Sequence, residues 1–177
     1  VYNGVDERDV EIRLNQSGRQ VFLDDHPIQR LSDFFGTLNV VVFTPFDVTL
    51  FLGNPKERRT NLDRTLFSAR PTFADISSEY ATTLKQRNTL LKERQVDPVL
   101  LSVYDDTLIE RGSLIVSARI ELIEELLPLY KKAFDRIYGG TVDSTLRYES
   151  SWLQKTCTDV ETIKEMFEKA LSDQHRN

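Results

Sequence analysis

The sequence predicts an α+β fold, with a small β portion followed by a larger helical portion. Two observations predict it. Apolar and polar residues alternate near the N-terminus, which is the period of a half-buried strand. Beyond residue 53, apolar residues recur every three or four positions, as in amphipathic helices. The chain has 177 residues, of which 40% are hydrophobic and 29% charged, and this is enough for a domain with a substantial core.

The β portion begins with a predicted hairpin from Asp9 to Leu23. Val10, Ile12 and Leu14 alternate with charged neighbours, and Gly18 supplies the turn. A short helix is expected to begin at Pro27 and to end at Gly36. The valine-rich run 38–43 is then the best candidate for a strand buried on both faces.

The helical portion begins with a well-capped helix over residues 55–67. Asn54 can cap it, Pro55 occupies the first position, and Glu57 can bond back to the cap, which is a variant of the capping box. Pro71 ends this pattern. Two long amphipathic helices follow, over residues 73–91 and 100–137, and Pro128 is expected to kink or divide the second.

The short link between the two long helices, at residues 96–98, implies an antiparallel helical hairpin. After the glycine pair 139–140, residues 142–148 have the pattern of a strand that could rejoin the first sheet. Thr158 or Asp159 is expected to cap a last helix. The predicted domains are therefore a partial β lobe (1–52), a helical arm (53–138) and a returning strand and helix (139–177).

Composition excludes several classes of function. The single cysteine, Cys157, cannot form an internal disulfide, and with two distant histidines it leaves no zinc cluster. No apolar run approaches the ~20 residues of a membrane span, and no signal peptide opens the chain. No catalytic set and no metal-ligand spacing is visible. These features favour a reducing, cytoplasmic setting.

The net charge of −5 does not favour nucleic acid overall, but the charge is uneven. Residues 54–94 carry nine Lys or Arg against five Asp or Glu, so a basic segment lies on an acidic body. This is compatible with a local polyanion contact. A solvated helix face explains it equally well.

A junction of seven residues, 53–59, packs a glycine, a helix cap and three cations together. Free N–H groups at a helix start attract anions, and Gly53 lets the backbone approach one. Lys56, Arg58 and Arg59 add positive charge, and arginine can hold phosphate through two hydrogen bonds. The alternative is a capped helix whose arginines pair with acids such as Asp63.

A second candidate lies on the following helix, at Lys85, Gln86, Arg87 and Asn88. Lys85 and Arg87 are two positions apart, so their side chains diverge. The group could contact a phosphate backbone or a partner protein, or it could be an exposed basic face.

Several blocks of the sequence, in one order along most of the chain, resemble the RecF family. The first block resembles the family signature and consists of Phe43, Pro45, Asp47, Gly53, Pro55, Arg58, Arg59, Leu62 and Asp63. The second resembles the next block of the family and consists of Leu84, Lys85, Gln86, Arg87, Asn88, Leu90, Leu91 and Lys92. The third resembles an aromatic-Asp stretch (Tyr104, Asp105, Leu108, Gly112, Ile115 and Arg119), and the fourth resembles a strand that returns to the head (Leu146, Tyr148 and Ser150).

The resemblance implies part of an ATPase head of the ABC/SMC/Rad50 type with an inserted helical arm. RecF-like proteins bind ATP with Mg²⁺, bind gapped DNA, dimerise, and work with RecO and RecR to support RecA loading in recombinational repair and the SOS response. In that family the phosphate loop precedes the residues matched here, and the signature motif and acidic metal strand follow them. This piece is therefore expected to hold no cofactor and to be inactive as an ATPase alone.

The resemblance also assigns expected sites. Pro45, Asp47 and Gly53 would lie near the nucleotide, although Phe46 stands where the family usually has an acid. Contacts with DNA backbone or a dimer partner would come from Lys56, Arg58, Arg59, Lys85, Arg87 and Lys92. The alternative is an arm that docks RecR or a second RecF-like chain without touching DNA.

Overall fold

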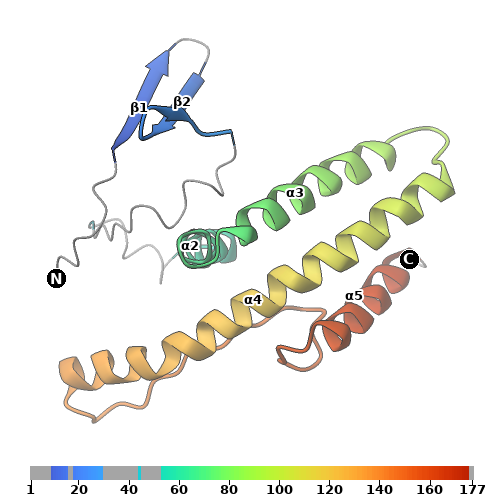
Figure 1. Cartoon of the computed structure of the whole chain (residues 1–177). Coiled ribbons are helices and arrows are strands. Elements are labelled where there is room, and N and C mark those ends of the chain that lie inside the picture. Colours follow the sequence, from blue (N-terminus) through green and yellow to red (C-terminus); the bar gives the residue numbers. More distant parts are fainter. Residues whose placement is uncertain (1–8, 16–17, 30–43, 45–52, 176–177) are drawn as a thin grey trace. The chain divides into compact units, whose positions relative to one another are not determined.

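The computed structural model describes residues 9–15, 18–29, 44 and 53–175 of the chain (Figure 1). Two compact units are present, Val1–Ala74 and Asp75–Asn177, and each is described by itself. The predicted strand 38–43, and the helix expected before it from residue 30 onward, lie outside the described residues. The domain limits at residues 52 and 138 stay predictions.

The first unit contains the predicted β-hairpin. Strand β1 (Val10–Asn15) pairs antiparallel with β2 (Gly18–Leu23), which also pairs with the short β3 (His26–Pro27). Asp24 and Asp25 form the β2–β3 turn with φ of 50° and 64°, a conformation that aspartate tolerates. This turn puts Pro27 opposite Phe22 in the sheet, so the prediction that a helix begins at Pro27 is wrong.

Helix α2 (Pro55–Ala69) confirms the predicted cap. The Glu57 N–H donates to Asn54 Oδ1 at 3.1 Å. In return, the Asn54 side-chain amide donates to Glu57 Oε1 at 3.3 Å. The box is thus closed between two side chains, whereas a serine or threonine cap would use its backbone N–H. The helix ends before Pro71, as predicted.

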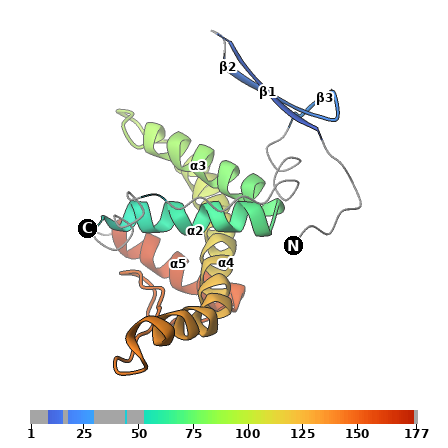
Figure 2. The ribbon, with the colours of Figure 1, turned by 90° about the vertical axis from the view of Figure 1, so that its left-hand side faces the viewer.

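Helices α3 (Thr72–Leu90) and α4 (Pro98–Tyr138) are the two long helices. Asp97 caps α4 by accepting from the N–H groups of Val99 and Leu100. The helix is 41 residues long and contains Pro128, and its C-cap is Gly139, whose φ is 65°. In Figure 2 the C-terminal end of α4 departs from the direction of its middle. Pro128 therefore lies within one bent helix and does not divide it.

The predicted antiparallel hairpin of α3 and α4 is present (Figure 1). Two ion pairs join the helices: Arg87 with Asp105, and Glu79 with Arg111. Moving toward the N-terminus of α3 thus corresponds to moving toward the C-terminus of α4, as antiparallel neighbours require.

Helix α5 (Val160–His175) packs along α4 and completes the core of the second unit. Asp159 caps it, because its carboxylate accepts from both the N–H and the hydroxyl of Thr162. The fully buried Ile120 and Ile163 join Val116. Partly buried side chains surround this cluster: Tyr148, Trp152, Leu153, Cys157 and Met166.

The predicted strand 142–148 is not a strand in the described structure. This segment runs back along α4 (Figure 1), with Asp143 3.9 Å from Lys131 and Tyr148 3.4 Å from Arg119. Its burial alternates with period two, as the sequence predicts. The described residues offer it no partner strand, so it stays extended without a β ladder.

Candidate functional site

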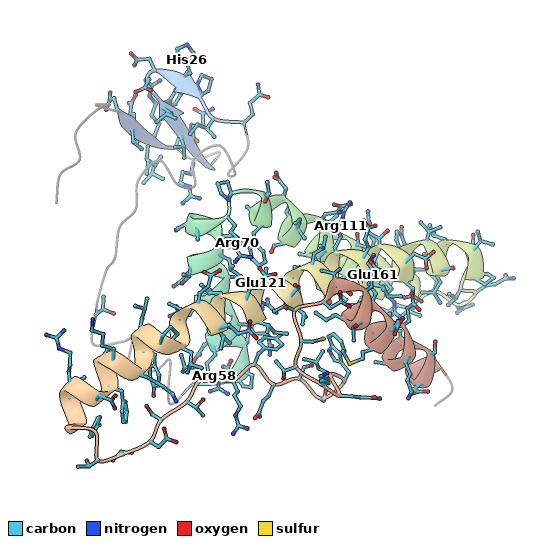
Figure 3. The ribbon with its side chains drawn as sticks, turned by 60° about the horizontal axis from the view of Figure 1, so that its bottom comes forward. His26, Arg58, Arg70, Arg111, Glu121 and Glu161 are labelled. Atoms are coloured by element: carbon cyan, nitrogen blue, oxygen red, sulfur yellow. The ribbon has the colours of Figure 1, made fainter. Side chains whose placement is uncertain are left out.

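The predicted cations at the start of α2 are all exposed to solvent. Lys56 and Arg59 are three positions apart on one side of the first turn, and their charged groups have no partner among the described residues. Arg58, labelled in Figure 3, instead donates from its guanidinium to the Gly53 carbonyl at 2.7 Å. Arg58 thus fixes the chain before the helix, and Lys56 and Arg59 remain available to an anion.

The backbone at this helix start is largely occupied by the cap. The N–H groups of Glu57 and Arg58 donate to Asn54, and Pro55 has no N–H. Of the first N–H groups, Lys56 alone lacks a partner among the described residues. An anion here would therefore be held mainly by side chains, and less by the helix backbone than the sequence predicted.

On α3 the buried positions follow a seven-residue pattern. Ile76, Tyr80, Thr83, Arg87 and Leu90 are spaced alternately by four and three and are buried or half-buried. This is the spacing of a seam between two packed helices. Leu84 lies four positions after Tyr80, a spacing that predicts the apolar face of an amphipathic helix, but Leu84 is 36% exposed, because Thr83 and Arg87 occupy the seam.

Arg87 lies within the hairpin and does not face solvent. Its Nε is 2.5 Å from Asp105 Oδ1, and the two side chains are only 10% and 14% exposed. A buried guanidinium needs such a partner, because desolvation of an unpaired charge is costly. Of the six predicted contact residues, Arg87 is therefore placed to hold α3 against α4.

A second ion pair of the hairpin joins Glu79 of α3 to Arg111 of α4; Arg111 is labelled in Figure 3. The Arg111 Nε is 2.8 Å from Glu79 Oε2, yet it lacks the alignment of a hydrogen bond. The attraction is therefore Coulombic, and it is weakened by the partial exposure of both side chains.

Lys85 and Lys92 lie seven residues apart, so they are on the same side of α3 and its C-terminal turn. Both are exposed, and their ammonium groups have no partner in the described part of the chain. The predicted divergence of Lys85 from Arg87 is confirmed, since one faces solvent and the other the seam. Leu84 and Leu91, which is 42% exposed, each precede one of these lysines.

Two further exposed cations, Arg64 on α2 and Arg94 after α3, carry no motif that would mark them in the sequence. Both lack a partner among the described residues. The positive charge of residues 54–94 includes both, and this is the only sequence signal for them.

Of the loop expected near a nucleotide, Gly53 is described and half-buried, whereas Pro45 and Asp47 lie outside the described residues.

Tyr80, a half-buried residue of the seam, is a titratable group with a shifted pKa. Burial raises the pKa of the Tyr80 hydroxyl above its ordinary value, against a smaller opposing effect of Arg119. Tyr80 also lies against Gly112 of α4, whose missing side chain leaves room for the Tyr80 ring.

Within the described residues no group of three His, Cys, Asp or Glu side chains could hold a metal ion. No described helix combines the length and the apolar character needed to span a membrane.

The fold matches that of known recombination mediators. One structure of the recombination mediator protein RecF of the RecFOR pathway aligns with a TM-score of 0.84 and 23% identity, over 94% of this chain and 45% of that chain. A second, RecF with ATP, aligns with a TM-score of 0.83 at 23% identity and the same coverage. The chain thus has the α+β fold of part of these RecF structures.

Sequence comparison identifies the family more closely. DNA replication and repair protein RecF of Myxococcus xanthus is 43% identical over 138 residues, or 77% of this chain and 36% of the relative. RecF of Clostridioides difficile is 31% identical over 163 residues, or 92% and 43%. No protein-family model matches. The chain belongs to the RecF family, and it spans about two fifths of the length of these curated relatives.

Proposed function

We propose that these residues serve recombinational DNA repair as part of a RecF-like protein, and that exposed cations of α2, of α3 and of the turn after α3 contact DNA backbone. The proposed contacts are Lys56 and Arg59 in the first unit and Lys85 and Lys92 in the second. The observation that carries the proposal is that all four are exposed and lack partners among the described residues. Arg58 would assist by holding the Gly53 loop.

The chemistry of these groups suits a phosphate backbone. Lysine and arginine bind phosphate oxygens without reading bases, so the contact would be independent of sequence and strongly dependent on salt. The proposed ligand is DNA at a gap, in a whole protein that binds ATP with Mg²⁺ and works in the cytoplasm with RecO, RecR and a second copy to support RecA loading. Support for ATP comes from the solved RecF complex with ATP.

A binding titration tests this proposal. The chain and its variant with Lys56, Arg59, Lys85 and Lys92 changed to alanine would be titrated with gapped DNA at several salt concentrations. A matched control removes four other exposed cations of the second unit that lack partners among the described residues, namely Lys132, Arg136, Lys155 and Lys169. Loss of affinity in the first variant and not in the control is the expected result. Equal losses in both would refute the assignment.

The alternative role, docking of RecR or a second RecF-like chain, is favoured by one observation on α3. Leu84 and Leu91 are 36% and 42% exposed beside Lys85 and Lys92. Protein interfaces combine an apolar centre with a charged rim, whereas a phosphate backbone makes no use of exposed leucines. Changing Leu84 and Leu91 to serine would weaken binding to RecR and spare DNA binding if this role holds. Unchanged binding to both RecR and a second RecF-like chain would eliminate it.

A further inference from the structure

A second stripe of residues runs along α3, beside the seam that faces α4. Its members are spaced alternately by four and three residues, which is the period of a packed helix face. This outer stripe consists of Ser77, Ala81, Leu84, Asn88 and Leu91. Leu91 follows the last residue of α3, yet its N–H still donates to the Arg87 carbonyl at 3.0 Å. All members except Ser77 are exposed, so α3 presents a second packing pattern to solvent.

The composition of the outer stripe is that of an interface between helices. Leu84 and Leu91 are one heptad apart and are 36% and 42% exposed. Single exposed leucines are common, but leucines that repeat after seven residues are typical of the core positions of a coiled coil. Ala81 is small enough to let another helix approach closely. Asn88 occupies the alternate core position, where a polar side chain fixes the register of the partner.

The charge beside the outer stripe selects its occupant. Lys85 and Lys92 follow the two leucines on the flank that points away from the seam, and they have no partner in the described part of the chain. This flank also holds Ser78, Thr82 and Thr89, so the stripe and the flank together contain no Asp or Glu. Flanking charges choose the partner in pairs of helices. A second copy of α3 would bring the same lysines and be repelled, whereas a helix with carboxylates would be attracted.

We infer that the outer stripe docks an amphipathic helix of a partner protein. The apolar residues of this helix would pack on Leu84 and Leu91, and its Asp or Glu side chains would pair with Lys85 and Lys92. Docking of one helix face on another is a common mode of recognition. Because the same lysines are proposed DNA contacts, the docked helix displaces DNA from this face. The displacement rests on the proposed function, whereas the docking does not.

The two leucines distinguish this ligand from DNA. Both ligands neutralise Lys85 and Lys92, so added salt weakens both contacts. Only the helix also buries Leu84 and Leu91, and the burial of apolar surface does not depend on charge. The docked helix is therefore expected to keep this face at salt concentrations that release DNA.

Two synthetic helix-forming peptides of about three heptads test the docking. The first carries leucine at its core positions and glutamate at its flanks, and the second carries serine in place of each leucine. Both are used below the concentration at which they self-associate. Fluorescence anisotropy is expected to show that the first binds the chain at least about 10-fold more tightly and releases labelled gapped DNA. Equal binding of the two peptides, or binding of neither, would overturn the inference.

Paired substitutions locate the docked peptide. Leu84→Ser with Leu91→Ser is expected to weaken binding of the leucine peptide at least about 10-fold and to leave DNA affinity unchanged. Val99→Ser with Val103→Ser is the matched control, because these α4 side chains are 73% and 53% exposed and lie outside the outer stripe. This control should bind the peptide as the parent does, and equal losses in the two variants would overturn the inference. Unchanged Trp152 fluorescence checks that each variant is folded.

Two further measurements separate this docking from a homodimer and from the DNA contacts. If the parent chain sedimented as a dimer that Leu84→Ser with Leu91→Ser dissociated, the occupant would be a second copy and the inference would be overturned. Lys85→Ala with Lys92→Ala is expected to weaken both peptide binding and DNA binding. A loss of DNA binding alone would refute the docking. A loss of peptide binding alone would refute the proposed DNA contacts and the displacement, while the docking measured without DNA would stand.

Discussion

Replacing Arg87 with alanine tests whether this residue holds the helical hairpin together. The change would leave Asp105 charged and only 14% exposed, in a seam where its partner had been 2.5 Å away. Removing one partner of a buried pair costs about 3–5 kcal/mol. Asp105 retains some solvent contact and a further interaction, so a loss of about 2–4 kcal/mol in the free energy of unfolding is expected.

Urea denaturation followed by tryptophan fluorescence measures this loss. Trp152 is the single tryptophan of the chain, and it stacks on Phe167 in the same unit as the ion pair, with ring centroids 4.8 Å apart. With a slope of about 1–3 kcal/mol/M, the midpoint should fall by roughly 1–2 M. Lys85→Ala, two residues away but exposed, is the control and should stay within ~0.5 kcal/mol of the parent.

Two results would refute the reasoning about Arg87. One is an Arg87→Ala midpoint that matches the Lys85→Ala midpoint, since the pair would then behave as a surface contact. The other is a large stability loss in the double variant Arg87→Met with Asp105→Leu. Replacing both charges by apolar side chains should be nearly neutral or stabilising.

Three further predictions concern helices α2, α3 and α4. Gly112→Ala should destabilise the second unit by about 1–3 kcal/mol, because a Cβ there would collide with the Phe167 ring; an unchanged urea midpoint would contradict this packing. Stability should fall as pH rises above about 10, the ordinary tyrosine pKa. The reason is that burial raises the pKa of Tyr80, so the folded state binds the hydroxyl proton more tightly than the unfolded state does. The Tyr80→Phe variant should show a smaller fall in stability, and a pH profile identical to that of the parent would exclude Tyr80 as the source. Asn54→Ala should cost α2 about 1 kcal/mol through loss of its cap, seen as reduced helicity by circular dichroism, whereas Asn54→Ser should retain the helix; equal helicity in all three proteins would contradict the cap.

Local signals in the sequence predicted most of the described elements. The hairpin follows from strict alternation before Gly18, and α2 follows from Asn54, Pro55 and Glu57, which act within one turn. The division between α3 and α4 follows from Pro98 in the same way. These features depend on neighbours in the sequence, so they need no knowledge of the tertiary fold.

The errors involve residues distant in sequence. Proline suits a helix start, which is why the sequence predicts one at Pro27, but pairing with Phe22 draws Pro27 into the sheet. Arg87 resembles part of a binding surface because it is a cation between other cations. Its partner Asp105 lies 18 residues away, and no local pattern links the two. Residues 142–148 have the period of a strand but no partner strand in the described structure.

The same reasoning separates the predicted contact residues. Helical spacing distinguishes Lys85 from Arg87, because positions two apart point in different directions. It does not reveal which of the two faces the seam, because both are cations. The pattern that does reveal it is the alternating four- and three-residue spacing that includes Thr83 and Arg87, two polar residues that a search for apolar positions passes over.

The salt dependence of DNA binding tests the central claim most directly. For duplex DNA, the slope of log K against log salt has a magnitude of roughly 0.9 for each phosphate that the protein neutralises. Removing Lys56, Arg59, Lys85 and Lys92 should therefore reduce the slope of the RecF-like protein by as much as about 3.6. The control without Lys132, Arg136, Lys155 and Lys169 should keep the parent slope. The assignment of these cations to DNA would be contradicted if the first variant had the same slope as the parent protein, or if the slope fell equally in the variant and the control.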